Sequence, residues 1–526
     1  MSEESIKLLL KNLEKETALY ENYVSEQLVD ICKALAQAME EPDYRQPITD
    51  FVMDLIHKCN ETGFYITVYL YSFLVQVTTS ASCAYEFLKY ITQNPHISKE
   101  SQYYLYYQLS HLFFTTEALN TPENKGALWN LFNHIFAEYK KIYECKFPLI
   151  PQTERNENLI VVLTAQYLTT EHGPTKTALD RCHTIVESMH KQVLLINTAE
   201  CLTKVGCIPF FNANYANYAS AFLQKESEEW KGVTVPFFQC DQIMPDSNYL
   251  DTLLGDLYRM KPAYIVDIGG SSILGNLCTL FTTTLGIGLC PSELTCCCET
   301  YQALGKPVDA NDRTILSAAD IPEDRIIESI FTSGLKSQQH TLTAHDLNLD
   351  ESFYNILVVG TRLDSEVTEE FLSLIQTLPS DRVKVNFCGY FNTYESMINS
   401  HPELNRICNY IGFQSDILAV LDCVDLYINP TRRGGGTSCV EALSKGIPVI
   451  TEKFGDVYSN AGDDFAVQDY EEMHHEILHY LNDPSYYCLQ SKKAVSRSNI
   501  LLETDSEFER ILQICHQKDL ASYSFK

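Results

Sequence analysis

Positive charge is scarce in this chain. Of 526 residues, 39 are lysine or arginine and 69 are aspartate or glutamate, which gives a formal net charge of −30. General binding of nucleic acids needs basic surfaces that displace counterions from phosphates, so the composition argues against nucleic acid as a partner. A phosphate-bearing ligand would have to be held by local donors against this unfavourable field.

Long apolar runs are also missing. No uninterrupted stretch approaches the roughly 20 residues that a membrane-spanning helix requires. Residues 1–5 are polar and acidic and do not have the pattern of a secretory signal. We therefore expect a cytoplasmic protein without a transmembrane segment.

The 19 cysteines lack the spacing of a disulfide framework. Cys296, Cys297 and Cys298 are adjacent, but neither a C-x-x-C pair nor suitably spaced histidines accompany them, as a zinc site would require. We expect reduced thiols and no metal, with metal binding by this run as the less favoured alternative.

Signatures of several enzyme classes are absent as well. The chain has no Gly-Lys-Ser/Thr P-loop and no G-x-G-x-x-G dinucleotide fingerprint. No Ser-His-Asp or Cys-His set can be picked out by spacing. These absences disfavour a P-loop NTPase and a dehydrogenase.

Residues 1–150 have a helical pattern with few glycines or prolines. Ile6, Leu9, Leu10 and Leu13 recur at helical spacing. Aromatic residues are dense at 103–114, where they suit either the core of a helical bundle or a platform for an acceptor peptide or partner. We expect an N-terminal helical domain, 1–150, through which the chain could bind a second copy or a protein partner.

After a polar linker at 151–158, buried runs alternate with helical segments. Runs at 159–163, 193–196 and 263–268 predict strands of one domain, 159–340, and runs at 355–360, 383–387, 426–428 and 448–450 predict strands of a second, 350–500. Such alternation is typical of parallel sheets with helices on both faces. Residues 501–526 should form a helical tail. The predicted fold is α/β, with two Rossmann-like domains that face a cleft.

The most informative stretch is 425–450. A buried run leads to Gly434, Gly435 and Gly436, followed by a helix that Thr437 or Ser438 would cap and that a later glycine would end. Free amides at such a helix start, together with the positive end of the helix dipole, favour a phosphate-bearing ligand. A plain tight turn is the alternative.

Each charged residue around this turn has two interpretations. Ser438 and Glu441 fit the S-x-x-E capping box, but Glu441 could instead accept hydrogen bonds from ribose hydroxyls. Arg432 and Arg433 could neutralise a diphosphate or remain solvated surface charges. We slightly favour phosphate contact for one of the two arginines.

Ligands of open parallel sheets bind outside the carboxyl ends of the strands. In the second domain this rule places Gly360, Thr361 and Arg362 at the site, although Arg362 could also pair with a carboxylate. Gly412 and Phe413 lie in another strand-end loop, whose backbone could hold a base edge or form an ordinary turn.

The first domain has two strand-end loops of interest. His172 lies in the first of them and could act as an acid, a base or an acceptor contact, or be an exposed loop histidine. We expect the acceptor side of the cleft to be lined by Gly173, Thr175, Gly269, Gly270 and Ser271.

The second domain resembles the nucleotide-sugar-binding half of GT-B glycosyltransferases, particularly the family-4-like retaining enzymes. The similar pieces, in order, are 356–363, 386–389, 410–413, 424–430 and 434–450. The resemblance implies a GT-B fold, with a nucleotide-sugar that is a substrate and therefore no cofactor. It also implies a diphosphate at Gly435, Gly436, Thr437 and Ser438, a ribose at Glu441 and phosphates beside Arg362.

The chain departs from this family pattern at two places. Members often carry a second glutamate eight positions before the ribose-binding one, where this chain has Arg433. They also often have a lysine shortly after the strand-end arginine, where this chain has Asp-Ser-Glu at 364–366. Arg432 or Arg433 could supply the missing positive charge.

We therefore expect a metal-independent glycosyltransferase that moves a sugar from a nucleotide-diphosphate donor, a UDP-sugar by preference, to a protein or glycan acceptor. His172 and Arg362 are the candidate catalytic residues, and helix-start amides would stabilise the leaving diphosphate. Two alternatives remain open. The chain could be a non-catalytic, sugar- or peptide-recognising partner of an active transferase, or a nucleotide-sugar epimerase.

Overall fold

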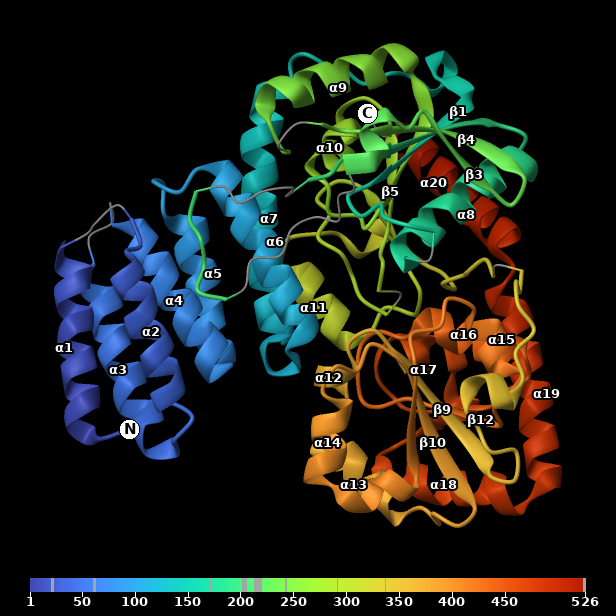
Figure 1. Cartoon of the computed structure of the whole chain (residues 1–526). Helices are drawn as coiled ribbons and strands as arrows, with labels where there is room; N and C mark the ends of the chain where they lie inside the picture. Colours follow the sequence, from blue (N-terminus) through green and yellow to red (C-terminus); the bar gives the residue numbers. More distant parts are fainter. Residues whose placement is uncertain are drawn as a thin grey trace.

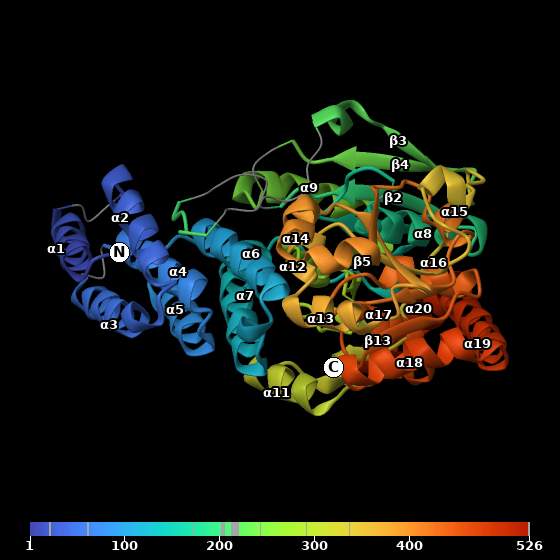
Figure 2. The same cartoon turned by 60° about the horizontal axis from the view of Figure 1, so that its bottom comes forward.

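An all-helical N-terminal domain precedes two domains that are each built on a mainly parallel sheet (Figures 1 and 2). The computed structural model describes residues 1–19, 23–59, 63–170, 172–200, 206–211, 220–241, 244–290, 292–335 and 337–523. The architecture confirms the α/β prediction of two Rossmann-like domains behind a helical region. None of the helices in these ranges combines the length and the apolar character needed to cross a membrane.

The helical domain consists of α1 Glu3–Leu19, α2 Glu26–Ala38, α3 Pro42–Lys58, α4 Phe64–Thr78, α5 Ala81–Gln93, α6 Lys99–Thr115, η1 Glu117–Leu119 and α7 Pro122–Tyr143. Tyr103, Tyr104 and Tyr106 of α6 are buried, so these tyrosines form core and not an exposed platform. This core continues into one face of the first sheet through Val161 and Ile265. The helical domain therefore shares a hydrophobic core with the first Rossmann-like domain.

The first sheet has eight strands in the order β3-β4-β2-β1-β5-β6-β7-β8, all parallel except the β3–β4 edge pair. The predicted strands 159–163, 193–196 and 263–268 are confirmed as β1, β2 and β5, because their apolar runs are buried on both faces. The elements are η2 Gln152–Glu154, β1 Asn156–Thr164, α8 Gly173–Glu187, β2 Gln192–Asn197, η3 Ser220–Gln224, β3 Ser227–Trp230, β4 Val233–Gln239, α9 Ser247–Met260, β5 Pro262–Ile268, α10 Ile273–Leu277, η4 Cys278–Leu280, β6 Thr283–Ile287, β7 Tyr301–Leu304, α11 Ala310–Ala318, η5 Glu323–Arg325 and β8 Ile326–Glu328.

The second sheet has six parallel strands in the order β11-β10-β9-β12-β13-β14. The four predicted strands of this domain are confirmed as β9, β10, β12 and β13. The elements are η6 Ala344–Leu347, β9 Tyr354–Gly360, α12 Leu363–Glu366, α13 Glu369–Thr377, β10 Val383–Gly389, α14 Tyr394–Ser400, η7 Pro402–Arg406, β11 Cys408–Gly412, α15 Ile417–Leu421, β12 Leu426–Ile428, α16 Gly436–Ser444, β13 Val449–Glu452, α17 Gly455–Ala461, η8 Asp463–Phe465, β14 Ala466–Val467, α18 Tyr470–Asn482 and α19 Pro484–Leu501.

The last helix, α20 Thr504–Tyr523, leaves the second domain and returns to the first. Figure 1 shows it, in red, running up behind the first sheet. Phe508, Leu512 and Cys515 enter the core of that sheet, and Arg155 donates to Asp519 over 3.3 Å. The predicted helical tail is thus confirmed, and it links the two Rossmann-like domains a second time.

The strand order of the first sheet reverses between β1 and β5, the place where such sheets bind ligands. In this sheet, a side chain of the protein occupies the position where a ligand would bind. Glu200 accepts from the amides of Ile273 and Leu274 at the start of α10, over 2.8 and 3.2 Å, and from the Tyr103 hydroxyl over 2.5 Å. Asp267 lies beside it and accepts from Ser272. Both carboxyl groups are buried, so at this point the edge between β1 and β5 is occupied by the protein's own side chains.

The order of the second sheet reverses between β9 and β12, whose carboxyl ends open toward the first domain. Close backbone approach shapes this edge. Gly389, at the end of β10, has φ +127°, and a Cβ at this position would lie 1.7 Å from the Gly360 carbonyl oxygen. Only glycine therefore fits there.

The first prediction concerns this close approach. Gly389→Ala should lower the free energy of unfolding well beyond the control Gly412→Ala, because position 412 also has a positive φ (+71°) but open space around it. A positive φ alone costs an alanine about 1–2 kcal/mol. Urea denaturation of both variants measures the difference. Equal losses would show that the Gly360 contact is not restrictive.

The second prediction concerns Asp267. Burial, and secondly the nearby Glu200, raise the pKa of the Asp267 carboxyl to about 7. Between the unfolded pKa near 4 and this folded value, only the folded state keeps the proton, so stability must fall as pH rises, by up to about 1.4 kcal/mol per pH unit. Asp267→Asn should remove this contribution. Unfolding curves at pH 5 to 8 test it, and parallel pH dependences of the two proteins would contradict it.

Candidate functional site

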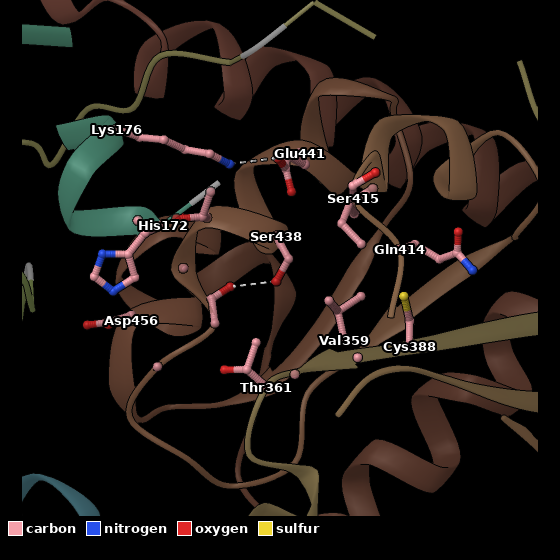
Figure 3. Close-up of a pocket in the computed structure, with 18 of the residues that line it drawn as sticks. His172, Lys176, Val359, Thr361, Cys388, Gln414, Ser415, Ser438, Glu441 and Asp456 are labelled. Atoms are coloured by element: carbon pink, nitrogen blue, oxygen red, sulfur yellow. Dashed lines mark hydrogen bonds and ion pairs between the residues drawn. The ribbon is translucent and has the colours of Figure 1, made fainter. Parts of the chain in front are cut away.

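A pocket of about 520 Å³ lies where the carboxyl edge of the second sheet faces the first domain. Its walls come from all three domains. The second sheet contributes the ends of β9 and β10 and the glycine turn, the first domain contributes the start of α8, and the helical domain contributes Phe114. Figure 3 shows the side chains that converge on it.

The glycine turn delivers the N-terminus of α16 to this pocket. The N-cap is Gly435, at φ +101°, so the prediction that Thr437 or Ser438 caps the helix is wrong. Gly435 has no side chain that could accept from the first amides, which a helix cannot satisfy internally. The Ser438 hydroxyl turns back and donates to the Gly435 carbonyl over 3.0 Å. The predicted helix end at Gly446 is confirmed by its left-handed φ of +70°.

Glu441 is not part of a capping box. Because α16 begins at Gly436, Ser438 occupies the third helical position and Glu441 lies a turn further along. The Glu441 carboxylate faces the pocket instead, and the ammonium of Lys176 on α8 approaches it to 3.8 Å (Figure 3). The geometry thus removes the capping interpretation and places the carboxylate in the wall of the pocket.

Arg432 is buried, and its guanidinium is occupied within the protein. It donates to Asn429 Oδ1 over 2.7 Å, to the Val359 carbonyl over 2.6 Å and to Glu366 Oε2 over 2.7 Å. A Cβ at Gly435 would lie 2.8 Å from this guanidinium. Arg432 lines the pocket but has a structural role as well, because these bonds tie β9 to the glycine turn.

Arg433 also differs from the prediction, because it does not line the pocket. Its guanidinium pairs with Glu117 of the helical domain over 2.6 Å and contacts Glu293, in the loop after β6. It also lies 5.0 Å from the centre of the Phe454 ring. Arg433 thus joins all three domains at one point, through Glu117 and Glu293.

Arg362 follows β9 and lines the pocket, as the strand-end rule predicted. Its side chain is 44% exposed, pairs with Glu366 at 3.0 Å and lies 5.3 Å from the centre of the Phe114 ring. Gly434 leaves the space that this guanidinium fills, since a Cβ there would be 3.0 Å from it. Arg362 is therefore a cation that can reach a ligand, unlike Arg432.

His172 is the N-cap residue of α8 and lines the pocket from the first domain. Its Nδ1 is buried, and none of the described residues forms a hydrogen bond with it. Burial lowers the pKa of the imidazole, so the ring is neutral near pH 7. A neutral ring with a vacant acceptor nitrogen suits a base or a hydrogen-bond partner for a ligand.

Asp456, at the start of α17, also lines the pocket and was not predicted from the sequence. Burial raises the pKa of its carboxyl to about 7, although the charges of Arg433 and Arg362 act in the opposite direction. It is therefore a titrating group within the pocket. Its position depends on the turn after β13, which no local sequence signal indicates.

An aromatic pair borders the other end of the pocket. Phe413, which lines the pocket, is 48% exposed and stacks on Tyr390 with ring centres 5.0 Å apart. Gly412 has φ +71° and turns the chain at the end of β11, but does not itself line the pocket. Gly360 and Thr361 line it at the end of β9, as expected.

The acceptor-side residues separate into two groups. Gly173 lines the pocket, whereas the buried Thr175 accepts from the Leu168 amide over 2.9 Å and holds the turn before α8. Residues 269–271 do not line the pocket. Gly270 packs against Thr295, and the Ser271 carbonyl accepts from Tyr103. The cleft contact predicted for Gly269, Gly270 and Ser271 is therefore corrected to an internal junction with the helical domain.

Sequence patterns did not reveal Lys176 or Phe114 as pocket residues. Lys176 follows His172 by one helical turn, which is a usable signal once α8 is placed. Phe114 comes from another domain and has no such signal. Among the described residues, no group of three or more histidine, cysteine, aspartate or glutamate side chains could hold a metal, and Cys296 and Cys297 are buried.

Comparison with known proteins finds one family and a set of similar folds. Residues 355–483 match the family described as Glycosyl transferases group 1. No curated protein sequence matches the chain. A mutant O-GlcNAc transferase from Thermobaculum terrenum is similar in structure, with 11% identity, 98% of this chain and 100% of that chain covered, and a TM-score of 0.48.

Two further solved structures are similar over about 70% of this chain. A glycosyltransferase from Rickettsia africae has 10% identity, with 70% of this chain and 98% of that chain covered and a TM-score of 0.46. A pneumococcal O-GlcNAc transferase in complex with UDP and GlcNAc has 8% identity, with 69% and 99% covered and a TM-score of 0.42. The family match spans β9 to α18 and includes the glycine turn, so the second Rossmann-like domain is similar in sequence to Glycosyl transferases group 1 over residues 355–483.

Proposed function

We propose that the chain transfers a glycosyl group from a nucleotide-diphosphate sugar to an acceptor. The proposal rests mainly on the N-terminus of α16, which faces the pocket between the domains. Its N-cap residue, Gly435, has no side chain that could accept hydrogen bonds from the first amides. Backbone amides and the helix dipole favour an anion there. The family match of the same segment supports glycosyl transfer.

Different pocket residues bind different parts of the donor. The diphosphate lies on the first amides of α16 beside Arg362, and the ribose hydroxyls donate to Glu441. The base lies toward Phe413, and the sugar extends toward His172 on α8. A UDP-sugar is the donor we propose, from the resemblance of the sequence to UDP-sugar enzymes.

Charge development at the leaving group determines the chemistry. As the bond between the sugar and the diphosphate breaks, negative charge grows on the diphosphate, and preorganised amides together with Arg362 stabilise it without a metal. The neutral His172 accepts a proton or a hydrogen bond from the incoming acceptor hydroxyl or amide. Closure of the two domains over the donor limits its hydrolysis by water.

A second candidate function follows from Arg433. The position where family members often have a sugar-binding glutamate is here an arginine engaged with Glu117 and Glu293. Loss of that carboxylate favours a donor-binding subunit that assists an active transferase. Such a subunit would bind the nucleotide but turn over no donor.

The test combines binding with turnover. If the donor is a UDP-sugar, UDP should bind more tightly than GDP or ADP and should therefore raise the melting temperature more. A ligand present at 100 times its Kd stabilises a protein by about 2.7 kcal/mol. Release of UDP from UDP-glucose, UDP-galactose and UDP-N-acetylglucosamine should persist in EDTA. Binding without any turnover supports the assisting subunit, and interconversion of donor sugars without an acceptor supports an epimerase. Binding of none of these nucleotides contradicts the proposal.

Glu441→Gln gives a prediction that is specific to the ribose. Removing the carboxylate charge weakens hydrogen bonds from the ribose hydroxyls, and charged hydrogen bonds contribute about 1.5–3 kcal/mol, so UDP affinity should fall at least about tenfold. The wild type should prefer UDP to 2′,3′-dideoxy-UDP, and the variant should largely lose this preference. Titration calorimetry measures both ligands.

The control is the stability of the ligand-free variant. Because Glu441 is not a capping residue and its ion pair with Lys176 is long, at 3.8 Å, the ligand-free Glu441→Gln variant should still unfold in one cooperative transition. An equal loss of affinity for both nucleotides would remove the ribose role.

A further inference from the structure

Lys176 lies in the pocket without a role in the mechanism given above. It belongs to the first turn of α8, in the first Rossmann-like domain, and its side chain is only 17% exposed. Figure 3 shows it reaching from α8 across the pocket toward Glu441 on α16. Glu441 and Lys176 thus form an ion pair between the two domains that enclose the donor site.

The contact between them is loose. The distance from Lys176 Nζ to Glu441 Oε1 is 3.8 Å, which is an ion pair but beyond normal hydrogen-bond reach. An ammonium group carries three donors and no acceptor, so it can turn toward a second anion without leaving the first. Glu441 lies about a turn from the amides at the start of α16, and its charge would otherwise repel a diphosphate there.

The other cations of the pocket are engaged differently. Among the described lysines and arginines that line it, Arg432 is buried in bonds to the protein and Arg362 pairs with Glu366. The proposed nucleotide position gives neither Glu366 nor the partners of Arg432 a contact with the ribose. Lys176 is paired with the one carboxylate that the ribose itself would engage. When the ribose binds Glu441, the Lys176 ammonium becomes free to contact a second anion.

The two helices meet end to end at this place. A Cβ at Gly173, the first residue of α8, would lie 3.9 Å from Thr437 Oγ1 in the first turn of α16. The positive ends of both helix dipoles therefore face the same region, which favours an anion between them. Lys176 lies one turn into α8 on the side that faces Glu441.

We propose that Lys176 is a donor-binding residue supplied by the opposite domain: its ammonium contacts the donor diphosphate while it neutralises Glu441. Nucleotide binding then holds α8 and α16 together across the cleft. This inference rests on the proposed function, because it takes the diphosphate to lie at the start of α16. It assigns the cation that the sequence lacks after the strand-end arginine to a different domain.

The test compares UDP, UMP and uridine by titration calorimetry at fixed ionic strength. Lys176→Gln should weaken UDP binding about ten- to a hundredfold, because a charge-assisted contact to phosphate is lost. The loss should be smaller for UMP and absent for uridine, which has no phosphate. Lys176→Arg keeps the charge and should retain most of the UDP affinity. It also shows that position 176 tolerates substitution.

Lys493→Gln is the matched control. Lys493 also pairs with a carboxylate, Asp464, at 2.6 Å, but on α19 outside the pocket. Its substitution should leave the affinities for all three ligands unchanged. A comparable loss of UDP affinity in this variant would assign the effect to general surface charge and would overturn the proposal.

The remaining outcomes separate this inference from the proposed function. If wild-type protein binds UDP and Lys176→Gln binds it equally well, the inference fails and the donor site stands. If Lys176→Gln weakens UDP, UMP and uridine by the same factor, Lys176 serves only to orient Glu441, and the phosphate contact is overturned. If the wild type binds none of the three, the proposed function fails and this inference fails with it.

Discussion

The buried guanidinium of Arg432 is the interaction on which the candidate site depends. Burying a cation is costly unless it is paired and fully hydrogen-bonded, and here Glu366, Asn429 and the Val359 carbonyl meet that requirement. These bonds connect the end of β9 to the turn after β12, across the point where the strand order reverses. The turn is thereby fixed in the form that starts α16 at the pocket. Gly435 is required by this packing, since a Cβ there would lie 2.8 Å from the Arg432 guanidinium, and it also lines the pocket.

An acidic chain must use its few cations for different tasks if it binds an anionic donor, as proposed. Arg432 builds the turn, and Arg433 joins the helical domain to both sheets through Glu117 and Glu293. Arg362 and Lys176 remain within the pocket, one from each Rossmann-like domain. Each of the two is accompanied by a carboxylate, which keeps the ligand-free pocket close to neutral and limits its attraction for other anions. In the proposed function, selectivity for a diphosphate would depend on geometry, because the helix amides add directed donors that a general positive surface lacks.

The sequence was sufficient for the sheets and insufficient for the details of the site. Apolar runs such as 355–360 and 159–163 predicted their strands because parallel strands are buried on both faces. The cap of α16 was mispredicted because Thr437 and Ser438 are residue types that cap helices well. In the structure Gly435 is the N-cap, in the left-handed conformation, and it packs against the buried Arg432 guanidinium. The helix therefore begins earlier than the local sequence indicated. The role of Arg433 could not be predicted either, since its partners lie in two other domains. The same holds for the return of α20 to the first sheet, which depends on tertiary burial.

The site is composite, and this explains why the helical domain is fused to the first sheet. Phe114 borders the pocket beside Arg362, and Glu117, a few residues later, holds Arg433. The first sheet cannot offer its own ligand edge, because Glu200 occupies the start of α10 and Tyr103 seals it. That part of its carboxyl edge positions the helical domain, while the start of α8, together with Leu289 and Phe331, faces the pocket. A pocket assembled from three domains is complete only when all three are packed together, so contacts far from the reacting atoms can control whether the donor is enclosed.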